Sequence, residues 1–246
     1  MMRSFDDAGT IAMPRDTSVK TPSLDVLYED NHCLAVVKPA RLLTAGDNTG
    51  DDTLLQRAKE YLKEKYQKPG NVYLGLVHRL DRPTSGVVLF ARTSKAAARL
   101  TAQFRGKSVQ KTYFAVVESD TVSAEAELTD WLIKDRSTNI VRTCTAETAG
   151  AKSAMLRFRR LRQHGGLSLL EVRPETGRSH QIRVQLSSRG MPIVGDTKYG
   201  ARRRLGGRIA LHAGQLRFQH PTRDEAITVA APLPDELNAL LNSREM

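Results

Sequence analysis

The amino-acid sequence predicts an α+β protein built on a mostly antiparallel sheet. Short runs rich in β-branched and aromatic residues outnumber the segments with helical periodicity, and the two kinds do not alternate as in βαβ proteins. Of the 246 residues, 40% are hydrophobic and 26% are charged, a globular mixture that can bury a sizeable core. Because the sequence has neither an internal repeat nor a Pro/Gly/Ser-rich linker, we expect one folded domain over residues 24–246.

The first elements are expected to follow a flexible tail over residues 1–23, which lack sustained periodicity. Two short β-prone runs, at residues 24–28 and 33–37, predict a pair of strands. The acidic pair at residues 51–52 can cap a helix over residues 53–66, where apolar residues at helical spacing form one face.

The stretch His-Arg-Leu-Asp-Arg-Pro-Thr-Ser-Gly at residues 78–86 is predicted to be a polar loop between two buried strands. Apolar residues 74–77 precede this loop and apolar residues 87–90 follow it. Loops held by rigid strands often carry catalytic groups, and Asp81 is the carboxylate in this one. Taken alone, however, a carboxylate between two arginines is more typical of a salt-bridged turn.

The rest of the chain continues the strand-rich pattern. A second helix is expected to begin at a cap on Thr93 or Ser94 and to end at Gly106. The elements predicted after it are strands at 110–117, 127–133, 139–145, 151–161 and 167–172, a helix at 180–188, short strands at 193–194, 209–212, 216–218 and 227–229, and a helix at 234–241.

The net charge of +11 points to a polyanionic partner. Fourteen basic residues, thirteen of them arginine, lie between Arg157 and Arg217 against three acidic ones, so this segment carries the whole excess. Arginine suits bidentate phosphate contacts and stacking on bases. A solvated charged face would mix the two signs, so the segment predicts nucleic-acid binding.

Several other functions have no support in the sequence. Cys33 and Cys144 show no CxxC spacing, and the six histidines do not occur at metal-ligand spacing, so we expect no metal site. The sequence lacks a phosphate-binding P-loop and a dinucleotide-binding glycine motif. It also lacks an apolar run long enough for a membrane span or a signal peptide, so we expect a soluble, cytoplasmic protein with no membrane partner.

Further motifs follow the central loop, and each would pass alone as a core strand, a turn or a phosphate-binding helix start. They are Lys-Thr-Tyr at 111–113, Gly-Arg-Ser-His-Gln-Ile-Arg at 177–183, Gly-Asp-Thr-Lys-Tyr-Gly at 195–200 and Leu-His-Ala at 211–213. In this order, with His-Arg-Leu-Asp and Thr-Ser-Gly before them, they resemble the RluA family of RNA pseudouridine synthases. The resemblance extends from about Val36 to Pro221.

The resemblance implies a pseudouridine synthase fold, which is a bent, mainly antiparallel mixed sheet with flanking helices and a central catalytic cleft. It also implies isomerisation of uridine in structured ribosomal or transfer RNA, with base flipping and without a cofactor or metal. Asp81 matches the essential aspartate, Arg183 its arginine partner, and Tyr113 the tyrosine that stacks on the target base. Arg79 matches the arginine that can fill the place of the flipped base.

The other residues expected to bind substrate are His78, Arg178, His180, Gln181 and Ile182, with Ile182 as an apolar wall. Arg202, Arg203, Arg204 and Arg208, from the basic segment, are expected to hold the RNA backbone. A carboxylate could act at Asp81 as a nucleophile or as a base on the ribose, and the sequence does not choose between these routes.

The sequence departs from the family pattern in two places. Arg41 stands where the family usually has glycine, so that loop is expected to differ or to contact RNA. Only about 23 residues precede the first predicted strand, so we expect no S4-like RNA-binding module and a monomeric catalytic domain. The competing hypothesis is a non-catalytic RNA-binding or ribosome-assembly protein on the same fold, which would not require Asp81, Tyr113 and Arg183 together.

Overall fold

The computed structural model describes residues 24–46 and 50–242, so the tail expected over residues 1–23 lies outside the described residues. The strands are β1 (Val26–Glu29), β2 (Cys33–Lys38), β3 (Gly75–Leu76), β4 (Ser85–Ala91), β5 (Gln110–Val117), β6 (Glu125–Asp135), β7 (Ile140–Cys144), β8 (Lys152–His164), β9 (Leu167–Pro174), β10 (Leu211–Gln219) and β11 (Ala226–Ala230). The helices are α1 (Leu54–Lys65), α2 (Ser94–Arg105), α3 (Gln181–Ser187) and α4 (Asp235–Ala239), with a 3₁₀ turn η1 (Thr197–Tyr199).

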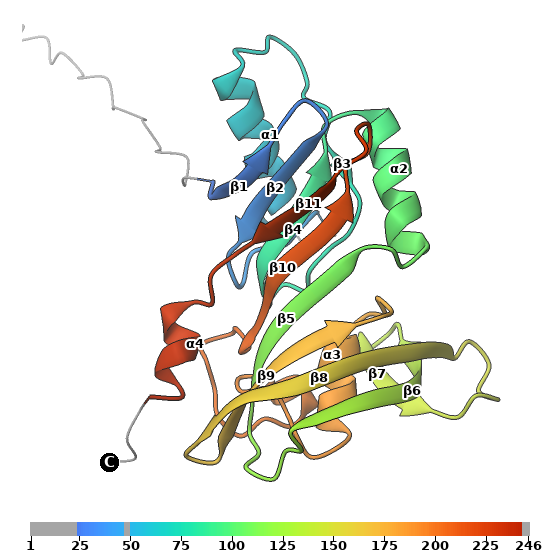
Figure 1. Ribbon diagram of the computed structural model, residues 1–246, viewed down its shortest axis with the longest axis vertical. Coiled ribbons are helices and arrows are strands. Elements are labelled where there is room, and N and C mark those ends of the chain that lie inside the picture. Colours follow the sequence, from blue (N-terminus) through green and yellow to red (C-terminus); the bar gives the residue numbers. More distant parts are fainter. Residues whose placement is uncertain (1–23, 47–49, 243–246) are drawn as a thin grey trace, which may run out of the picture.

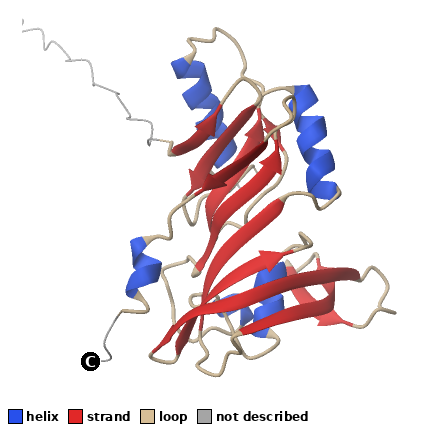
Figure 2. Cartoon of the chain, in the orientation of Figure 1, coloured by secondary structure: helices blue, strands red, loops and turns tan. Residues whose placement is uncertain are grey.

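All of these strands belong to one mixed sheet. Its main path runs β1-β2-β4-β10-β5-β9-β8-β6-β7, with β11 added to β10 and β3 added to β4. Among the described strands, only the pairing of β4 with β10 is parallel. The sheet bends along β5, which joins an upper half next to α1 and α2 to a lower half next to α3 (Figures 1 and 2). The predicted mainly antiparallel α+β architecture is therefore confirmed.

The upper half of the sheet is covered on both faces. Alternate residues of β2 and β4 face opposite sides, so Leu34 and Val36 pack with α1, whereas Cys33 and Ala35 pack with α2. This two-sided burial explains why the sequences of β2 and β4 are nearly continuous apolar runs. The lower half is covered on one face only, and β8 accordingly alternates buried residues with exposed arginines.

Two glycines allow close contacts where β4, β10 and β5 join the upper half of the sheet to the lower half. Gly86 has φ +117, and a Cβ there would lie 2.3 Å from the carbonyl oxygen of Ala213 on β10. A Cβ on Gly214 would likewise lie 2.4 Å from the ring of Phe114 on β5. Only glycine allows the strands to approach this closely, which brings the loop before β4 next to the middle of the sheet.

Several predicted boundaries were wrong. The two short strands expected at 209–212 and 216–218 are one strand, β10, with a bulge between Ala213 and Gln215. In the predicted strand 193–194, Ile193 forms only an isolated bridge to Val117. The strand expected before the central loop is only the two residues of β3, and Leu76 in it is 40% exposed, so that segment is not a buried strand.

The helix caps also differ in part from expectation. Thr53 caps α1 by accepting a hydrogen bond from the Gln56 backbone, so the acidic pair at 51–52 is not the cap. Thr93 caps α2 in the same way, as one of the two predicted caps. In the described ranges, 24–46 and 50–242, we find no helix with the length and apolar character needed to cross a bilayer.

Candidate active site

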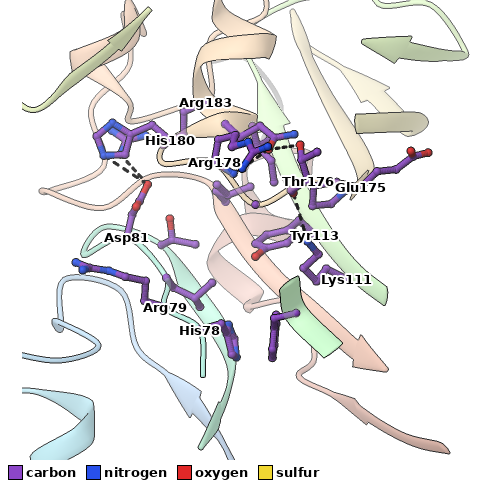
Figure 3. A pocket seen from close by; sticks show the side chains of 18 of the residues that line it. His78, Arg79, Asp81, Lys111, Tyr113, Glu175, Thr176, Arg178, His180 and Arg183 are labelled. Carbon is purple, nitrogen blue, oxygen red and sulfur yellow. Dashed lines mark hydrogen bonds and ion pairs between the residues drawn. The ribbon is translucent and has the colours of Figure 1, made fainter. Parts of the chain in front are cut away.

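A cavity of about 440 Å³ opens where the loop before β4, strand β5 and the start of α3 meet (Figure 3). This volume lies within the roughly 300–1,000 Å³ range of ligand pockets. The residues predicted to act on the substrate all line it: His78, Arg79, Asp81, Tyr113, Arg178, His180, Gln181, Ile182 and Arg183. The fold thus brings together motifs that lie about a hundred residues apart in the sequence.

The backbone around Asp81 is held by the loop that follows β2. The Lys38 side chain is fully buried, and its ammonium donates to the carbonyl oxygens of Pro39, Leu42 and Arg82 at 2.7–3.1 Å. Burial lowers the pKa of Lys38 to about 7, against the opposing effect of the Asp81 charge. Lys38 therefore ties the loop after β2 to the residue that follows Asp81.

Thr44 holds the residue before Asp81 in the same manner. Its hydroxyl donates to the Leu80 carbonyl oxygen at 2.9 Å and accepts from the Leu80 amide at 3.2 Å. The backbone of the residues on either side of Asp81, Leu80 and Arg82, is thus held by a second segment of chain, so the side chain at 81 is presented from a rigid loop.

Arg41, the predicted departure from the family pattern, lies in this same loop. Its backbone is left-handed, with φ +75, which is the conformation that glycine adopts most readily. The Arg41 amide donates to the Arg82 carbonyl oxygen, and the Arg41 carbonyl oxygen accepts from the Arg82 guanidinium. The arginine therefore keeps the backbone turn that glycine would form, and it adds an exposed cation beside the loop of Asp81.

Arg183 on α3 is the charged partner of Asp81. Its Nη1 lies 3.1 Å from Oδ2 of Asp81, while its Nε and Nη2 bind both carboxylate oxygens of Asp196 at 2.7 and 2.8 Å. Burial acts against the charge of Arg183, but the two carboxylates outweigh it and raise the pKa of the guanidinium. Arg183 and Asp196 are 5% and 2% exposed, whereas the Asp81 side chain is 31% exposed and open to the cavity.

Tyr199 and His180 complete the surroundings of this ion pair. The Arg183 guanidinium lies 4.9 Å from the centre of the Tyr199 ring, and the Tyr199 hydroxyl lies 2.7 Å from Nδ1 of His180. The other ring nitrogen of His180 is 3.8 Å from Asp81. Burial lowers the pKa of His180 to about 4 although Asp81 raises it, so the imidazole is neutral near pH 7.

Tyr113 and Ile182 form the apolar part of the cavity next to Asp81. Burial raises the pKa of the Tyr113 phenol, and the Asp81 charge raises it further, so the phenol stays protonated at neutral pH. Ile182 is 7% exposed and lines the cavity as the predicted apolar wall. Figure 3 shows the Tyr113 ring directed into the cavity, as a platform for a planar base requires.

Thr84 is a polar group in the cavity wall that lacks a partner. It is 2% exposed and lines the cavity, and its hydroxyl finds no hydrogen-bond partner among the described residues. Since buried hydroxyl groups are nearly always hydrogen bonded, this unsatisfied hydroxyl is an exception in the wall of the cavity.

His78 and Arg79 differ in how much of their side chain is free. Nε2 of His78 accepts the Leu89 amide of β4 at 2.9 Å, and the ring stacks on Phe104 of α2 at 4.7 Å. His78 therefore caps a strand position that neither β3 nor β10 reaches, and its role is partly structural. Arg79 is exposed at the rim of the cavity on the same side as Asp81 (Figure 3).

The amide of Gln181 is used within the protein. Its oxygen accepts from the Thr176 hydroxyl and the Arg178 amide, and its nitrogen donates to the Met155 carbonyl oxygen. Gln181 thus shapes the turn before α3 while it lines the cavity, and the substrate contact predicted for it stays a prediction. The helix predicted at 180–188 is α3, and its N-cap is His180, in a left-handed conformation at φ +51.

The basic segment is not one continuous surface. Arg157, Arg159 and Arg173 pair with glutamates on the open face of the lower sheet, and Arg189 pairs with Asp130. Arg202, Arg203, Arg204 and Arg208, which the sequence predicted as RNA-backbone contacts, do not line the cavity of Asp81. The Glu118 carboxylate accepts the amides of Arg202 and Arg203 at 2.8 Å, which fixes the loop while its arginine side chains remain exposed.

In the described part of the chain, one group of potential metal ligands lies outside the cavity. The ligand atoms of Asp30, Cys33 and His220 all lie within 4.8 Å of one another. His220 donates to Asp30 at 2.7 Å and accepts the amides of Thr222 and Arg223, so both of its ring nitrogens are occupied. The group therefore acts as a hydrogen-bonded tie between the β1–β2 and β10–β11 turns.

Sequence reasoning missed the residues that support the site. Lys38, Thr44 and Asp196 hold Asp81 and Arg183, yet each acts on residues far away in the chain. Asp196 and Tyr199 do lie in the Gly-Asp-Thr-Lys-Tyr-Gly motif, which the sequence shows as a pattern without a role. Only the folded contacts reveal what these side chains bind.

The fold and the cavity place the protein in the class of RNA-modifying isomerases that the motifs predicted. Residues 32–188 match the family described as RNA pseudouridylate synthase. The uncharacterized RNA pseudouridine synthase YhcT of Bacillus subtilis is 36% identical over 220 residues, which cover 88% of this chain and 71% of that protein. The chain therefore belongs to the family of RNA pseudouridine synthases, and the enzyme is an isomerase.

Other similar proteins agree with this assignment. Ribosomal large subunit pseudouridine synthase C of Vibrio parahaemolyticus is 37% identical over 223 residues, covering 88% of this chain and 68% of that protein. Ribosomal large subunit pseudouridine synthase D of Xylella fastidiosa is 35% identical over 255 residues, covering 98% and 73%. Among solved structures, human RNA pseudouridylate synthase domain containing 4 shares the fold, with a TM-score of 0.74 at 22% identity, covering 89% of this chain and 92% of that one.

The neutral state of His78 predicts how stability depends on pH. Burial lowers the pKa of His78 to about 3, and Lys111 lowers it further, whereas an unfolded histidine titrates near 6.5. The unfolded state thus binds more protons below pH 6.5, so folded stability falls as the pH falls from 6.5 toward 3. Between pH 7 and pH 5, the wild type should lose about 2 kcal/mol of unfolding free energy that His78→Gln retains.

Urea unfolding at both pH values measures this difference. The control is His164→Gln, which removes an exposed histidine and should follow the wild type. Parallel pH dependence in the wild type and His78→Gln would contradict the assignment of a buried, neutral His78.

Proposed function

We propose that this pseudouridine synthase isomerises uridines of large-subunit ribosomal RNA, with Asp81 as the catalytic carboxylate and Arg183 and Tyr113 as its partners. The observation that carries the proposal is the 3.1 Å contact between Arg183 and Asp81 at a cavity lined by Tyr113. An arginine that is held by a buried aspartate and extends one nitrogen to a solvent-accessible carboxylate fixes the orientation of that carboxylate.

The choice of ribosomal RNA rests on the relatives. Two of the proteins that match most of this chain are pseudouridine synthases of the large ribosomal subunit, types C and D. The net charge of +11 and the exposed arginine side chains at 202–204 are consistent with a large folded RNA as the substrate.

The reaction breaks the N1–C1′ bond of uridine, rotates the uracil and joins C5 to C1′, after which the C5 proton is lost and N1 gains a proton. Asp81 in its ionised form can begin this sequence by attack on C1′ or by removal of a ribose proton. The protonated Tyr113 can stack on the uracil and donate a hydrogen bond while the ring turns, and Ile182 closes the other apolar wall. The product keeps every atom of the substrate.

A uracil within folded RNA must leave its stack to reach this cavity, which costs a few kcal/mol. Arg79 stands at the rim two residues before Asp81 and forms no ion pair within the described part of the chain. Its planar cation can stack and form hydrogen bonds in the place that the base leaves. Arg79 thus stabilises the flipped state while Asp81 acts on the extruded nucleotide.

Replacing the proposed catalytic carboxylate tests the function directly. Asp81→Asn should reduce pseudouridine formation at least ~10³-fold, because the neutral amide neither attacks nor accepts a proton. The measurement is a pseudouridine map of ribosomal RNA from cells that lack the gene and carry the wild type or the variant. Sites that appear with the wild type alone identify the target uridines.

Asp120→Asn is the matched control, since Asp120 is an exposed aspartate outside the cavity. Its map should equal that of the wild type. Unchanged folding and RNA binding of Asp81→Asn, seen by circular dichroism and filter binding, would assign the loss to chemistry. Substantial product formation by Asp81→Asn would overturn the role of this residue.

The unpartnered hydroxyl of Thr84 should contact the substrate. Thr84→Val removes a buried hydroxyl without a partner, so the melting temperature should stay the same or rise. The kcat/KM for target RNA should fall about 10-fold, the equivalent of one hydrogen bond of roughly 1.4 kcal/mol. Thr44→Val is the contrasting variant, because its hydroxyl holds Leu80, and it should lower the melting temperature. A Thr84→Val enzyme with full kcat/KM would exclude the substrate contact.

The exposed arginines at 202–204 should bind RNA phosphates. Their triple alanine variant keeps the backbone hydrogen bonds to Glu118, so the loop should remain in place. Binding to ribosomal RNA fragments should weaken, and the slope of log K against log salt should fall by about 0.7 for each phosphate that the variant no longer neutralises. A triple variant that replaces the exposed Lys63, Lys68 and Lys95 removes the same charge and should keep the wild-type slope. Equal slopes in both variants would show that the 202–204 loop faces away from RNA.

A further inference from the structure

The cavity continues beyond Tyr113 to an end that the proposed chemistry does not use. Four cations line this end, and we name them the distal cation cluster: Arg105 at the end of α2, Lys107 in the next turn, Lys111 on β5 and Arg178 before α3. Lys111 lies across the cavity from Asp81, beside Tyr113 and Thr176 (Figure 3). The cluster therefore lines the same hollow as Asp81, and its Lys111 lies on the far side of that hollow from Asp81.

These cations lack negative partners. Within residues 24–46 and 50–242, none of the four forms an ion pair with a carboxylate. The Glu175 carboxylate also lines this end, but it lies 3.3 Å from Arg157, on the open face of the sheet. Lys111 is partly buried, which disfavours its charge, whereas Arg105, Lys107 and Arg178 are exposed, so the four present unpaired positive charge at this end of the cavity.

Lys111 shows this lack of a counter-ion most clearly. Its ammonium group makes one hydrogen bond, to the Thr176 carbonyl oxygen at 3.3 Å, although it has three hydrogens to donate. Burial lowers its pKa, and the neighbouring Lys107 lowers it further. Lys111 lies two residues before Tyr113 on β5, so both side chains point to the same face of the strand.

Lys107 occupies a backbone position that ordinarily belongs to glycine. Helix α2 ends in a Schellman motif, in which the Ser108 amide bonds to the Gln103 carbonyl oxygen and the Lys107 amide bonds to the Phe104 carbonyl oxygen. The left-handed residue of this motif is Lys107, at φ +60, while Gly106 before it has an ordinary φ of −76. A lysine thus stands in a strained position at the wall of the cavity.

We propose that the distal cation cluster binds one phosphate of the RNA backbone, on a nucleotide next to the flipped uridine. This inference rests on the proposed function, because a uracil stacked on Tyr113 brings its neighbouring phosphate to the side of Lys111. A phosphodiester offers two unbridged oxygens that accept several donors, and it brings the negative charge that the cluster lacks. Nε of Arg178 is bound to the Ser153 carbonyl oxygen, which leaves its terminal nitrogens for such a fork.

The phosphate contact also has a function in the reaction. Unstacking the uridine is unfavourable, and a fixed phosphate beside it restricts the extruded nucleotide to the orientation in which its ribose meets Asp81. The cluster is therefore a positioning site, made of residues that do not touch the reacting atoms.

A cycle of paired changes in protein and RNA tests the contact. The probe is the fluorescein-labelled pentanucleotide ApApUpApA, in which each of the four phosphates is replaced in turn by a neutral methylphosphonate. Its single uridine sets the register, and isomerisation leaves every phosphate in place, so turnover does not disturb the titration. Affinities are measured by fluorescence anisotropy at fixed salt.

With wild-type protein, one replacement next to the uridine should weaken binding about 10-fold, and the other three should weaken it much less. Lys111→Met should bind the unmodified probe about 10-fold more weakly, and that same replacement should then cause little further loss. Lys111→Arg should retain the coupling. Lys95→Met, which removes an exposed lysine at the start of α2, is the matched control and should behave as wild type.

Lys107→Gly separates binding from folding. Glycine relieves the left-handed strain, so this variant should melt at a higher temperature than wild type and still bind the probe more weakly. Equal methylphosphonate effects in wild type and Lys111→Met, or wild-type affinity of Lys107→Gly, would overturn the proposal. Failure of the proposed function would give a different result: the coupling between one phosphate and Lys111 would be measured in a protein that forms no pseudouridine.

Discussion

Arg183 binds two carboxylates, and the geometry of the cavity depends on which nitrogens of its guanidinium bind each of them. Asp196 takes two of the three nitrogens and leaves Nη1 for Asp81. A lone buried arginine beside Asp81 would be free to form a bidentate pair and draw the carboxylate into the protein. Because Asp196 is itself buried and Tyr199 covers the guanidinium, the arginine stays on α3 and Asp81 stays in the cavity.

The two halves of the sheet meet at this ion pair, so the bend of the sheet is what brings Asp81 and Arg183 together. Asp81 lies on the loop before β4 in the upper half, and Lys38 and Thr44 hold the backbone of the residues on either side of it. Arg183 lies on α3 against the lower half. Each side is rigid by itself, and the 3.1 Å contact closes the gap between them. Preorganisation of this kind is what a reaction on a flipped nucleotide requires.

Local patterns in the sequence predicted most of the strands and helices, whereas the residues of the cavity were predicted from the resemblance of motifs such as residues 78–86 and 177–183 to the RluA family. The features that were predicted wrongly or not at all are those that a contact with a distant residue determines. Strand β10 continues through Gly214 because the ring of Phe114 packs against that glycine, and no periodicity in residues 209–218 reveals it. The role of Asp196 could not be predicted for the same reason, since its partner Arg183 lies thirteen residues away on another element. The charge excess was real, but pairing with neighbouring glutamates removes much of it from the surface available to RNA.

Three side chains around the cavity stand in left-handed backbone positions, namely Arg41 at φ +75, Lys107 at φ +60 and His180 at φ +51. Each such residue costs roughly 1–2 kcal/mol, which glycine would avoid. Stability alone therefore favours glycine at all three positions, and the benefit must lie in the side chains. His180 supports this view, since its ring connects Tyr199 to the surroundings of Asp81. By the same reasoning, the cations of Arg41 and Lys107 fit the proposed function, in which a negatively charged RNA binds at this cavity.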